Sequence, residues 1–590
     1  MSQTVTGRLH DVLNEVAHFH FEATDYAAAE PLFRQVLSIA EENREGVGSV
    51  TAALVNLTSV LMAGCRFDEA ESNCRRALKI IQDRFGPADQ KIIRSLNTLA
   101  RLFEDTGRLS LAELLFRKAL AITEAAVGRR HPDLAVLLAN LGGCLRKMGR
   151  LNEAEPMVRE ALAIQQASFG PDHPDNSVFI TGLAALLLDT GRLGDAETLY
   201  RRALAIDEAR YGSGNVHVAN DLDHLAKVLY QTNRTADAEA LNRRALEIWE
   251  RGLGPNHPRV ARGLAGLGRI LRSMNRLAEA ESVFRRSLDI SQSLVGFEGE
   301  QAGTLDNLAQ LLRIANRFRE AEPLFRRSLQ IRTRMLGPRH HKVAESLNNL
   351  ALLLRDTNRV EEAEQLLRES LAIYEESLGP GDPELAVVLD NLAGLLRSTN
   401  RPDGVEQLYL RSISIVEASL GPEHPKVATR LNNIAVFFVS VNRLAEAEPL
   451  YRRALRIREN SFGPNHPEVA AVLSNLGMLL ARTNRIAEAE MMLRRALAID
   501  EQASGPRHPN TARRLRNLAA IVRATDQPVE AEMLLRRAVK ILLRAGLENG
   551  REPRELQVTI SDYSDLLAQM GLTREDVIAS LNNALLDATM

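Results

Sequence analysis

The chain has 590 residues, with 74 Lys or Arg against 76 Asp or Glu, so its formal net charge is −2. Proteins that bind nucleic acids or anionic membranes usually carry a basic excess or patch, and this balance favours neither partner. The first residues lack an apolar signal region, and no apolar run reaches the roughly 18 residues of a membrane span. We therefore expect a soluble, cytoplasmic protein.

Three cysteines, Cys65, Cys74 and Cys144, are too few for a disulfide framework, and Cys74 is expected to fill core volume. No CxxC pair or Cys/His cluster is present. His18 and His20 are two residues apart, which places them on different sides of a helix and not together on a metal ion. We predict inert thiols, no metal site and no bound cofactor.

The stretch Gly463–Gly505 shows how the chain is built. Gly463-Pro464 precedes His466-Pro467, which indicates a helix start because proline is tolerated in the first turn. Apolar residues then recur at helical spacing along two runs, separated by Asn484-Arg485. Neither run can bury its apolar stripe alone, so we predict an antiparallel helix pair that packs against a neighbouring pair.

The same pattern recurs mostly every 42 residues, with two steps of 41. The small residue of an Ala-Glu pair marks each copy, at Ala29, Ala70, Ala112, Ala154, Ala196, Ala238, Ala280, Ala321, Ala363, Val405, Ala447, Ala489 and Ala531. Thirteen copies at a fixed period are typical of a helical solenoid. The predicted fold is all-α: about 13 antiparallel helix pairs in residues 1–545, then capping helices in residues 546–590.

The order Leu-(Gly/Ala), (Gly/Asn)-Arg, Ala-Glu and Arg-Arg-Ala-Leu within each copy resembles a tetratricopeptide repeat. The 42-residue period and the linking pattern LGPxHPxVAxxLNNLA, as in Leu420 to Ala435, are similar to the long repeats of kinesin light chains and of many bacterial proteins. The resemblance covers residues 5–545. It implies a right-handed superhelix whose inner groove is lined by the first helix of each pair and binds extended peptides or proteins.

Residues 1–45 form the first predicted hairpin, and copies two to seven extend to about residue 295. A glycine ends each of these six copies, at Gly86, Gly128, Gly170, Gly212, Gly254 and Gly296. In the sixth copy Asp221, Asp223 and His224 invite a catalytic interpretation, but no Ser or Cys nucleophile lies at a recognisable spacing. Phosphate-binding, hydrolase and dinucleotide motifs are absent too. We predict no catalytic residues and no enzyme.

Two segments depart from the pattern. The linker Gly296–Glu300 has two glycines and no proline, so residues 296–303 are the favoured position for a bend, although sequence drift without a bend explains it too. In the tenth copy Gly404 falls inside the expected second helix and Val405 replaces the small alanine, which predicts a locally weaker hairpin.

The pattern changes after Ala545. Gly546–Gly550 is predicted to be a loop and Glu555–Met570 a helix. Thr573 and Asp576 resemble a capping box for a last helix that reaches about Ala588. We expect this pair to cover the final apolar face; docking of a separate partner by the tail is the alternative.

Asparagine precedes the Leu-(Ala/Gly) step in eight copies: Asn56, Asn140, Asn307, Asn349, Asn391, Asn433, Asn475 and Asn517. Asparagine is a mediocre helix former, so this row needs a reason. The carboxamides could hydrogen-bond to the backbone of an extended peptide. Alternatively, each could bridge to the adjacent repeat and fix the superhelical pitch. The two explanations have equal weight.

Arginine lies two turns further along the same helix in six copies: Arg146, Arg272, Arg313, Arg355, Arg397 and Arg523. In a groove these groups would favour carboxylates or phosphates, although Asp306 and Asp390 balance part of the charge. In the stretch Gly463–Gly505 the face opposite the leucines carries Ser474, Asn475, Met478, Ala481 and Arg482. The arginines of the turns, such as Arg443 and Arg485, and the Glu490–Arg494 type of pair are expected to be structural.

The candidate partner-binding groove therefore consists of Asn307, Arg313, Asn349, Arg355, Asn391, Arg397, Asn433, Asn475, Arg482, Asn517 and Arg523. We predict a scaffold that binds a protein or peptide partner, with an acidic peptide favoured. The alternative is a regulatory subunit that holds and controls a separately encoded effector enzyme. Single-stranded nucleic acid would need groove aromatics for stacking, and too few are present.

Overall fold

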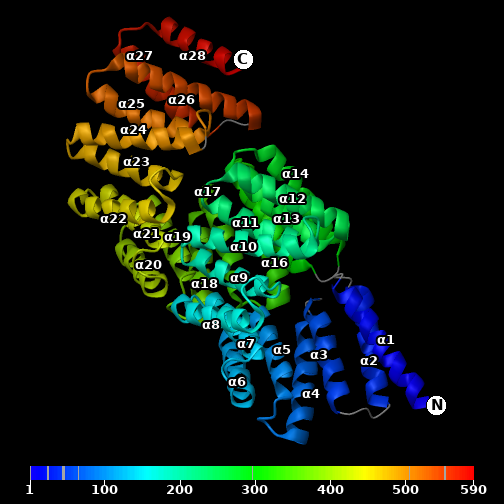
Figure 1. The fold of residues 1–590 in the computed structure, drawn as a ribbon. Helices are drawn as coiled ribbons and strands as arrows, with labels where there is room; N and C mark the ends of the chain where they lie inside the picture. The colour runs from blue at the N-terminus through cyan, green and yellow to red at the C-terminus, as the bar shows by residue number, and fades with distance from the viewer. Residues whose placement is uncertain are drawn as a thin grey trace.

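The computed structural model describes residues 2–22, 26–42, 47–63, 66–294, 297–503, 505–549, 553 and 555–589. Within these ranges the chain forms 28 α-helices, which pair in succession as antiparallel hairpins and stack into a curved array (Figure 1). The predicted all-α solenoid is therefore confirmed. We number the hairpins 1 to 13, from α1/α2 to α25/α26.

Hairpins 1 to 7 contain α1 (Ser2–Glu22), α2 (Tyr26–Glu42), α3 (Val47–Ala63), α4 (Phe67–Phe85), α5 (Ile92–Asp105), α6 (Leu109–Val127), α7 (Pro132–Lys147), α8 (Leu151–Phe169), α9 (Asn176–Asp189), α10 (Leu193–Tyr211), α11 (Val216–Gln231), α12 (Thr235–Leu253), α13 (Pro258–Ser273) and α14 (Leu277–Ser293). Hairpins 8 to 13 contain α15 (Glu298–Ile314), α16 (Phe318–Leu336), α17 (His341–Asp356), α18 (Val360–Ser377), α19 (Leu385–Ser398), α20 (Val405–Leu420), α21 (Pro425–Ser440), α22 (Leu444–Phe462), α23 (Pro467–Arg482), α24 (Ile486–Ala503), α25 (Pro509–Ala524) and α26 (Pro528–Asn549). The last two helices are α27 (Leu556–Gln569) and α28 (Arg574–Thr589).

Histidine starts several of the first helices. In α21, His424 is the capping residue and Pro425 occupies the first helical position. The imidazole Nδ1 of His424 accepts a hydrogen bond from the backbone N–H of Lys426 at 3.1 Å. This bond satisfies one of the amides that a helix start leaves unpaired, so the predicted role of the His-Pro pairs is confirmed here.

Each described turn between the two helices of a hairpin has a residue in the left-handed backbone conformation at the same place. Hairpins 3 to 5 place Gly107, Gly149 and Gly191 there. The later hairpins place Asn233, Asn275, Asn316, Asn358, Asn400, Asn442, Asn484 and Asp526 there. Asparagine visits this conformation more readily than most residues with a side chain. We call these residues the turn tips.

The core runs along the whole array. The residue of the Ala-Glu pair has no exposed surface in any hairpin, from Ala29 to Ala531. Cys74 and Cys144 are also fully buried, so Cys74 fills core volume as predicted. Cys65 lies outside the described residues.

The tenth hairpin differs from its prediction. Gly404 has a φ of 78° and precedes α20, which begins only at Val405. The expectation that Gly404 lies inside the helix is therefore wrong. Pro402 cannot donate a helical hydrogen bond, so the turn extends to Gly404 and the helix starts late. Val405 is nevertheless fully buried in the place of the small alanine.

The linker before hairpin 8 is shorter than expected. Glu298–Glu300 belong to the first turn of α15, so this part of the predicted linker is helical. Val295 and Gly296 lie outside the described residues. A bend within residues 296–303 stays a prediction.

The end of the chain confirms one prediction and corrects another. The predicted loop at 546–550 is wrong where it is described, because α26 continues to Asn549. Leu542 and Leu556 lie in one buried cluster, and this packing outweighs the weak helix propensity of Gly546. The capping box is confirmed: Thr573 N donates to Asp576 Oδ2 at 3.0 Å and Asp576 N to Thr573 Oγ1 at 3.3 Å. The division into an array (1–545) and a cap (546–590) stays a prediction.

The array winds far enough to touch itself. The imidazole Nε2 of His424 lies 2.8 Å from the carbonyl oxygen of Asp189, and that of His466 lies 3.2 Å from the carbonyl oxygen of Gln231. Helices α8 and α20 are also in contact, and Figure 1 shows the cyan segment beside the yellow-green one. Hairpins six apart thus meet, which makes one superhelical turn about six hairpins long. We call this line of contacts the seam.

Candidate partner-binding groove

The first helices lie on the inner side of the curve. Successive first helices touch one another, as α5 touches α7 and α15 touches α17. Elements on the inside of a curved stack lie closer together than those on the outside, so these helices form the concave wall. The candidate residues all belong to first helices, and the structure therefore brings them to one face of the array.

The asparagine row is half-buried along this wall. Asn307, Asn349, Asn391, Asn433, Asn475 and Asn517 each keep part of their surface exposed. Arg313, Arg355 and Arg397 are half-buried as well, whereas Arg482 and Arg523 are exposed. The wall thus presents carboxamides along its length and becomes more exposed and more basic toward the C-terminal end.

Several carboxamides of the row bridge to the preceding hairpin. Asn391 Nδ2 donates to Asn348 Oδ1 at 2.8 Å, Asn475 Nδ2 to Asn432 Oδ1 at 2.8 Å, and Asn517 Nδ2 to Ser474 Oγ at 3.0 Å. The structural explanation weighed from the sequence therefore applies to these residues. A carboxamide has two N–H donors and one oxygen acceptor, so each still has groups left for a partner.

Asn433 belongs to the same system through a buried carboxylate. Burial raises the pKa of Asp390 to about 6, and the charge of Arg430 and hydrogen bonds from Ser412 and Asn433 oppose that rise. Arg430 Nε lies 3.3 Å from Asp390 Oδ2. Part of the charge expected in the groove is therefore balanced internally at this hairpin.

Some arginines of the row form ion pairs or hydrogen bonds with neighbouring hairpins. Arg313 Nη1 donates to Asp356 Oδ2 at 2.5 Å, and Arg355 Nη2 lies 3.3 Å from Asp356 Oδ1. Arg482 donates to the carbonyl oxygen of Val439 at 2.9 Å. The structure thus brings two of the predicted arginines together on one aspartate.

Two buried guanidinium nitrogens lie on first helices of the concave wall. The Nε atoms of Arg397 and Arg513 are buried and have no hydrogen-bond partner among the described residues. Arg513 lies one turn before Asn517 on α25, on the same face of the helix. A buried donor without an acceptor is costly, but both atoms are closed to solvent, and the Arg397 guanidinium also hydrogen-bonds to Tyr409.

Sequence reasoning missed the acceptors of the asparagine row and misplaced one residue. Ser474 is only 1% exposed, so its predicted position on the open face is wrong. It lies in the junction between hairpins, where its hydroxyl accepts from Asn517. For Asn391, Asn475 and Asn517 the acceptor is the residue before the asparagine of the preceding hairpin. A spacing of 43 between donor and acceptor, one more than the period, was the available signal.

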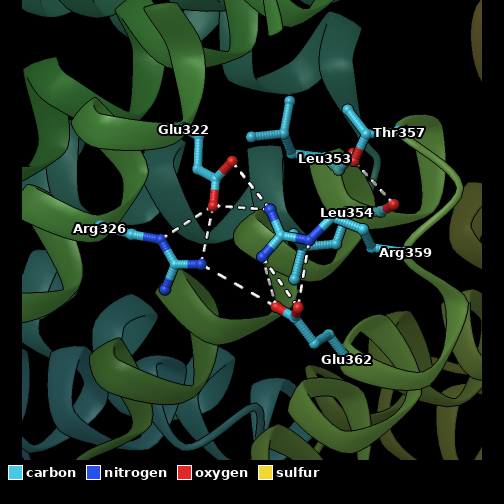
Figure 2. A network of polar contacts seen from close by, with 7 residues as sticks. All are labelled: Glu322, Arg326, Leu353, Leu354, Thr357, Arg359 and Glu362. Atoms are coloured by element: carbon cyan, nitrogen blue, oxygen red, sulfur yellow. Dashed lines mark hydrogen bonds and ion pairs between the residues drawn. The ribbon is translucent and has the colours of Figure 1, made fainter. Parts of the chain in front are cut away.

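The second helices carry a ladder of ion pairs on the outer side. In Figure 2 Arg359 lies between Glu322 of the preceding hairpin and Glu362 of its own, at 2.9 Å and 2.7 Å. Arg326 contacts the same Glu322 at 2.7 Å. Partial burial alone would raise the pKa of Glu322, but hydrogen bonds from Arg326 and Arg359 hold that pKa below its usual value.

The rungs of this ladder recur along the array. The arginine before a second helix pairs with a glutamate of the preceding hairpin in Arg108–Glu71, Arg150–Glu113, Arg192–Glu155, Arg234–Glu197, Arg276–Glu239, Arg317–Glu281, Arg359–Glu322, Arg401–Glu364, Arg443–Glu406 and Arg485–Glu448. The predicted structural role of the turn arginines is confirmed.

Burial determines the protonation state of the two described thiols. Burial raises the pKa of Cys74 to about 11 and that of Cys144 to about 12, so these thiols are protonated and unreactive at neutral pH.

Asp223, one of the acidic residues of hairpin 6, pairs with Lys227 at 2.6 Å. His18 packs edge-on against Phe33. In the described residues no group of three His, Cys, Asp or Glu side chains could hold a metal ion.

Comparison with protein-family models gives a match to a model described as "Tetratricopeptide repeat". It covers residues 49–125, 133–209, 217–293, 300–376, 349–418, 384–460, 431–502 and 487–544. The chain belongs to the tetratricopeptide repeat family. Arrays of this family generally mediate protein–protein interactions, and the match identifies no catalytic domain. The resemblance predicted from the repeat pattern is confirmed.

Solved structures similar to this tetratricopeptide array include two of the kinesin-light-chain type. BtubC (BKLC) from P. vanneervenii is 28% identical, with 41% of this chain and 93% of that chain covered and a TM-score of 0.33. A putative kinesin light chain with nearly identical TPR-like repeats from Podosopora anserina is 23% identical, with 34% and 96% covered and a TM-score of 0.31. No curated protein matched.

No described helix of the array combines the length and the apolar character that a membrane span requires.

Proposed function

We propose that the array is a scaffold that binds an extended, acidic segment of a protein partner along its concave wall. The observation that carries this proposal is the basic end of the groove. Arg482 and Arg523 are exposed there, and Arg397 is half-buried. Guanidinium groups bind carboxylates with strong, charge-assisted hydrogen bonds.

The asparagine row supplies the second half of the binding mode. An extended peptide exposes backbone N–H and C=O groups at regular intervals, and carboxamides can pair with both. Asn391, Asn475 and Asn517 each use one N–H for the neighbouring hairpin. Their remaining groups would bind the backbone of the segment, while the arginines select acidic side chains.

A peptide-binding measurement tests the proposal. A fluorescent Glu-rich peptide of about 15 residues is titrated with the wild-type array and with the variant Arg397→Ala/Arg482→Ala/Arg523→Ala. We expect the groove variant to bind at least tenfold more weakly, which corresponds to about 1.4 kcal/mol or more. Titration with a Lys-rich peptide reports on charge selectivity.

The matched control removes three arginines from the outer side, Arg326→Ala/Arg368→Ala/Arg452→Ala. These residues each pair with a glutamate on their own second helix, and the net charge changes by the same amount. Equal loss of binding in both variants would show that peptide capture reflects general charge, and the groove would then not be the site.

A second variant, Asn349→Ala/Asn391→Ala/Asn433→Ala, tests the carboxamides in a pull-down from cell extract.

A further inference from the structure

The seam joins turn tips of one superhelical turn to helix starts of the next. A Cβ atom added to Gly191 would lie 2.9 Å from Cδ of Pro425, and one added to Gly149 would lie 3.0 Å from Cδ of Pro383. At Gly107 the added atom would lie 2.6 Å from Nε2 of His340. Successive turns of the superhelix are therefore in van der Waals contact at three successive hairpins.

The residue type at the turn tips changes where these contacts are made. The turn tips are glycine in hairpins 3 to 5, which lie against hairpins 9 to 11. The tips of hairpins 9 to 11 adopt the same backbone conformation with Asn358, Asn400 and Asn442. The turn itself therefore accepts asparagine, and the seam accepts it at Asn233 of hairpin 6. Glycine is required only at Gly107, Gly149 and Gly191, where the next superhelical turn leaves no space for a side chain.

Hydrogen bonds accompany the close contacts. His424 and His466 approach the carbonyl oxygens of Asp189 and Gln231, and Asn233 Nδ2 donates to the carbonyl oxygen of Ala503 at 3.4 Å. A cleft of 420 Å³ lies between the contacts at Gly149 and Gly191. Its lining includes the charged residues Arg146, Lys147, Asp189, Asp382, Glu384 and Lys426.

Closure along the seam has a consequence for the concave wall. An extended chain needs a continuous gap of about 5 Å, the spacing of neighbouring strands, and the contacts at hairpins 3 to 6 interrupt the space between the two superhelical turns at each hairpin. We infer that the seam is a lateral gate, which must open for a partner segment to enter the groove from the side. This inference rests on the proposed binding of a partner by the concave wall.

The contacts suit a gate that opens and closes. Each hairpin contributes one small contact or one hydrogen bond to the seam, and water can replace these bonds when the turns separate. In a solenoid, small rotations between successive repeats add up to a large change of pitch. Opening thus requires no hairpin to unfold.

The test opens the seam without altering the turns. The variant Gly107→Asn/Gly149→Asn/Gly191→Asn places at three tips the residue that the later hairpins already use. Spin labels at Asp195→Cys and Glu423→Cys, both exposed and on opposite sides of the seam, report the separation in a chain with Cys65→Ser, Cys74→Ala and Cys144→Ala. The reverse exchange, Asn358→Gly/Asn400→Gly/Asn442→Gly, is the control, and circular dichroism checks that each protein is folded.

We expect the seam variant to lengthen the label distance by at least about 5 Å and to bind the Glu-rich peptide about tenfold faster, with the control unchanged in both. An unchanged distance in a folded variant would overturn the gate. A longer distance with an unchanged association rate would overturn it too, while leaving peptide binding intact. Failure of every protein, including the wild type, to bind the peptide would reject the proposed function and the gate with it.

Discussion

At the scale of the residue, two positions 14 apart face each other across the junction between hairpins, one on a second helix and one on the next first helix. Arg332 Nη1 donates to Ser346 Oγ at 3.0 Å, and Arg514 Nε donates to Asp500 Oδ2 at 2.8 Å. In hairpins 6 and 7 the pair is Trp249 and Gly263. These three junctions are thus filled by pairs that complement each other in size, charge or hydrogen bonding, whereas the junction of hairpins 5 and 6 holds two buried carboxyl groups, Asp207 and Asp221.

Gly263→Ala tests this complementarity. A Cβ atom at Gly263 would lie 2.7 Å from Cζ3 of Trp249 and 2.8 Å from Cδ2 of Leu246. Both side chains are buried and would have to shift, so we expect a loss of about 1–3 kcal/mol in the free energy of unfolding. Urea unfolding monitored by the fluorescence of Trp249, the single tryptophan of the chain, measures it next to the mutated position.

Gly394→Ala is the matched control for that substitution. Gly394 lies in α19, and no atom outside its own helix turn lies within 4 Å of the added Cβ. We expect a small gain in stability, up to about 1 kcal/mol, because alanine is the better helix former. Similar losses at both glycines would show that the fit against Trp249 is unimportant.

At the scale of the element, the outer ladder couples each hairpin to the one before it. A turn arginine such as Arg359 lies between two glutamates of different hairpins (Figure 2). Exposed ion pairs contribute little individually, but here they recur along the array and share the same geometry. Their sum resists separation of the second helices on the outer side.

The salt dependence of thermal unfolding tests the ladder. We expect Arg317→Gln/Arg359→Gln/Arg401→Gln to lower Tm at low ionic strength. The difference from the wild type should shrink in 1 M NaCl, where the screening length falls to about 3 Å. Arg339→Gln is the control, since Arg339 pairs with Glu376 but is 74% exposed. A difference in Tm that persists at high salt would indicate lost packing in place of lost ion pairing.

The elements themselves were largely predictable, because a fixed period forces every copy to the same hairpin. Their exceptions were not. Gly404 leaves the helix because Pro402 precedes it, a local effect that overrides the alignment of the copies. Ser474 is buried because the junction between hairpins, and not the stripe of one helix, decides which positions are covered. The asparagine bridges depend on the same junction geometry.

At the scale of the whole molecule, the seam contains titratable groups that are neutral at pH 7. Burial lowers the pKa of His424 and His466, and it lowers that of His340 from 6.5 to about 4. The carbonyl of Asp189 favours protonation of His424, whereas Lys426 and Arg430 oppose it. In His424 the Nδ1 atom accepts from a backbone N–H, so it cannot also carry a proton without breaking the helix start.

We therefore expect the seam histidines to lose their contribution to stability, and the seam to open, as the pH falls from about 6.5 toward 4. In that range these histidines bind more protons in the unfolded chain, where they keep the ordinary pKa of 6.5, than in the folded chain. Their contribution consequently rises with pH across the window and is fully present above it, whereas the raised pKa of Asp390 acts in the opposite direction and away from the seam. Thermal unfolding and the spin-label distance, both measured at pH 7.5 and 5.0, check this expectation.

The variant His424→Asn/His466→Asn separates the seam from other acid effects. Asparagine is a natural cap in this chain, since Asn215 Oδ1 accepts from the N–H of His217 at 2.9 Å. The variant should keep its helix starts and lose much of the change in label distance between the two pH values. An identical pH response in variant and wild type would place the titrating groups elsewhere.

The seam could not be derived from the repeat pattern. It joins residues 235 apart, and their meeting depends on the sum of small rotations over six hairpins, which a period does not specify. The change from glycine to asparagine tips was visible along the chain, but its meaning needs the position of the next superhelical turn. The concave wall of first helices, in contrast, was implied by the resemblance to tetratricopeptide repeats.

The glycine tips also restrict where a repeat can be added, because an added repeat changes which turn tip faces which helix start across the seam. If one extra copy were inserted between hairpins 6 and 11, Asn233 would move beneath Pro425, the place where only the bare backbone of Gly191 now fits. Unequal recombination inside this interval would therefore clash with the winding, whereas copies gained after hairpin 12 would meet no such obstacle.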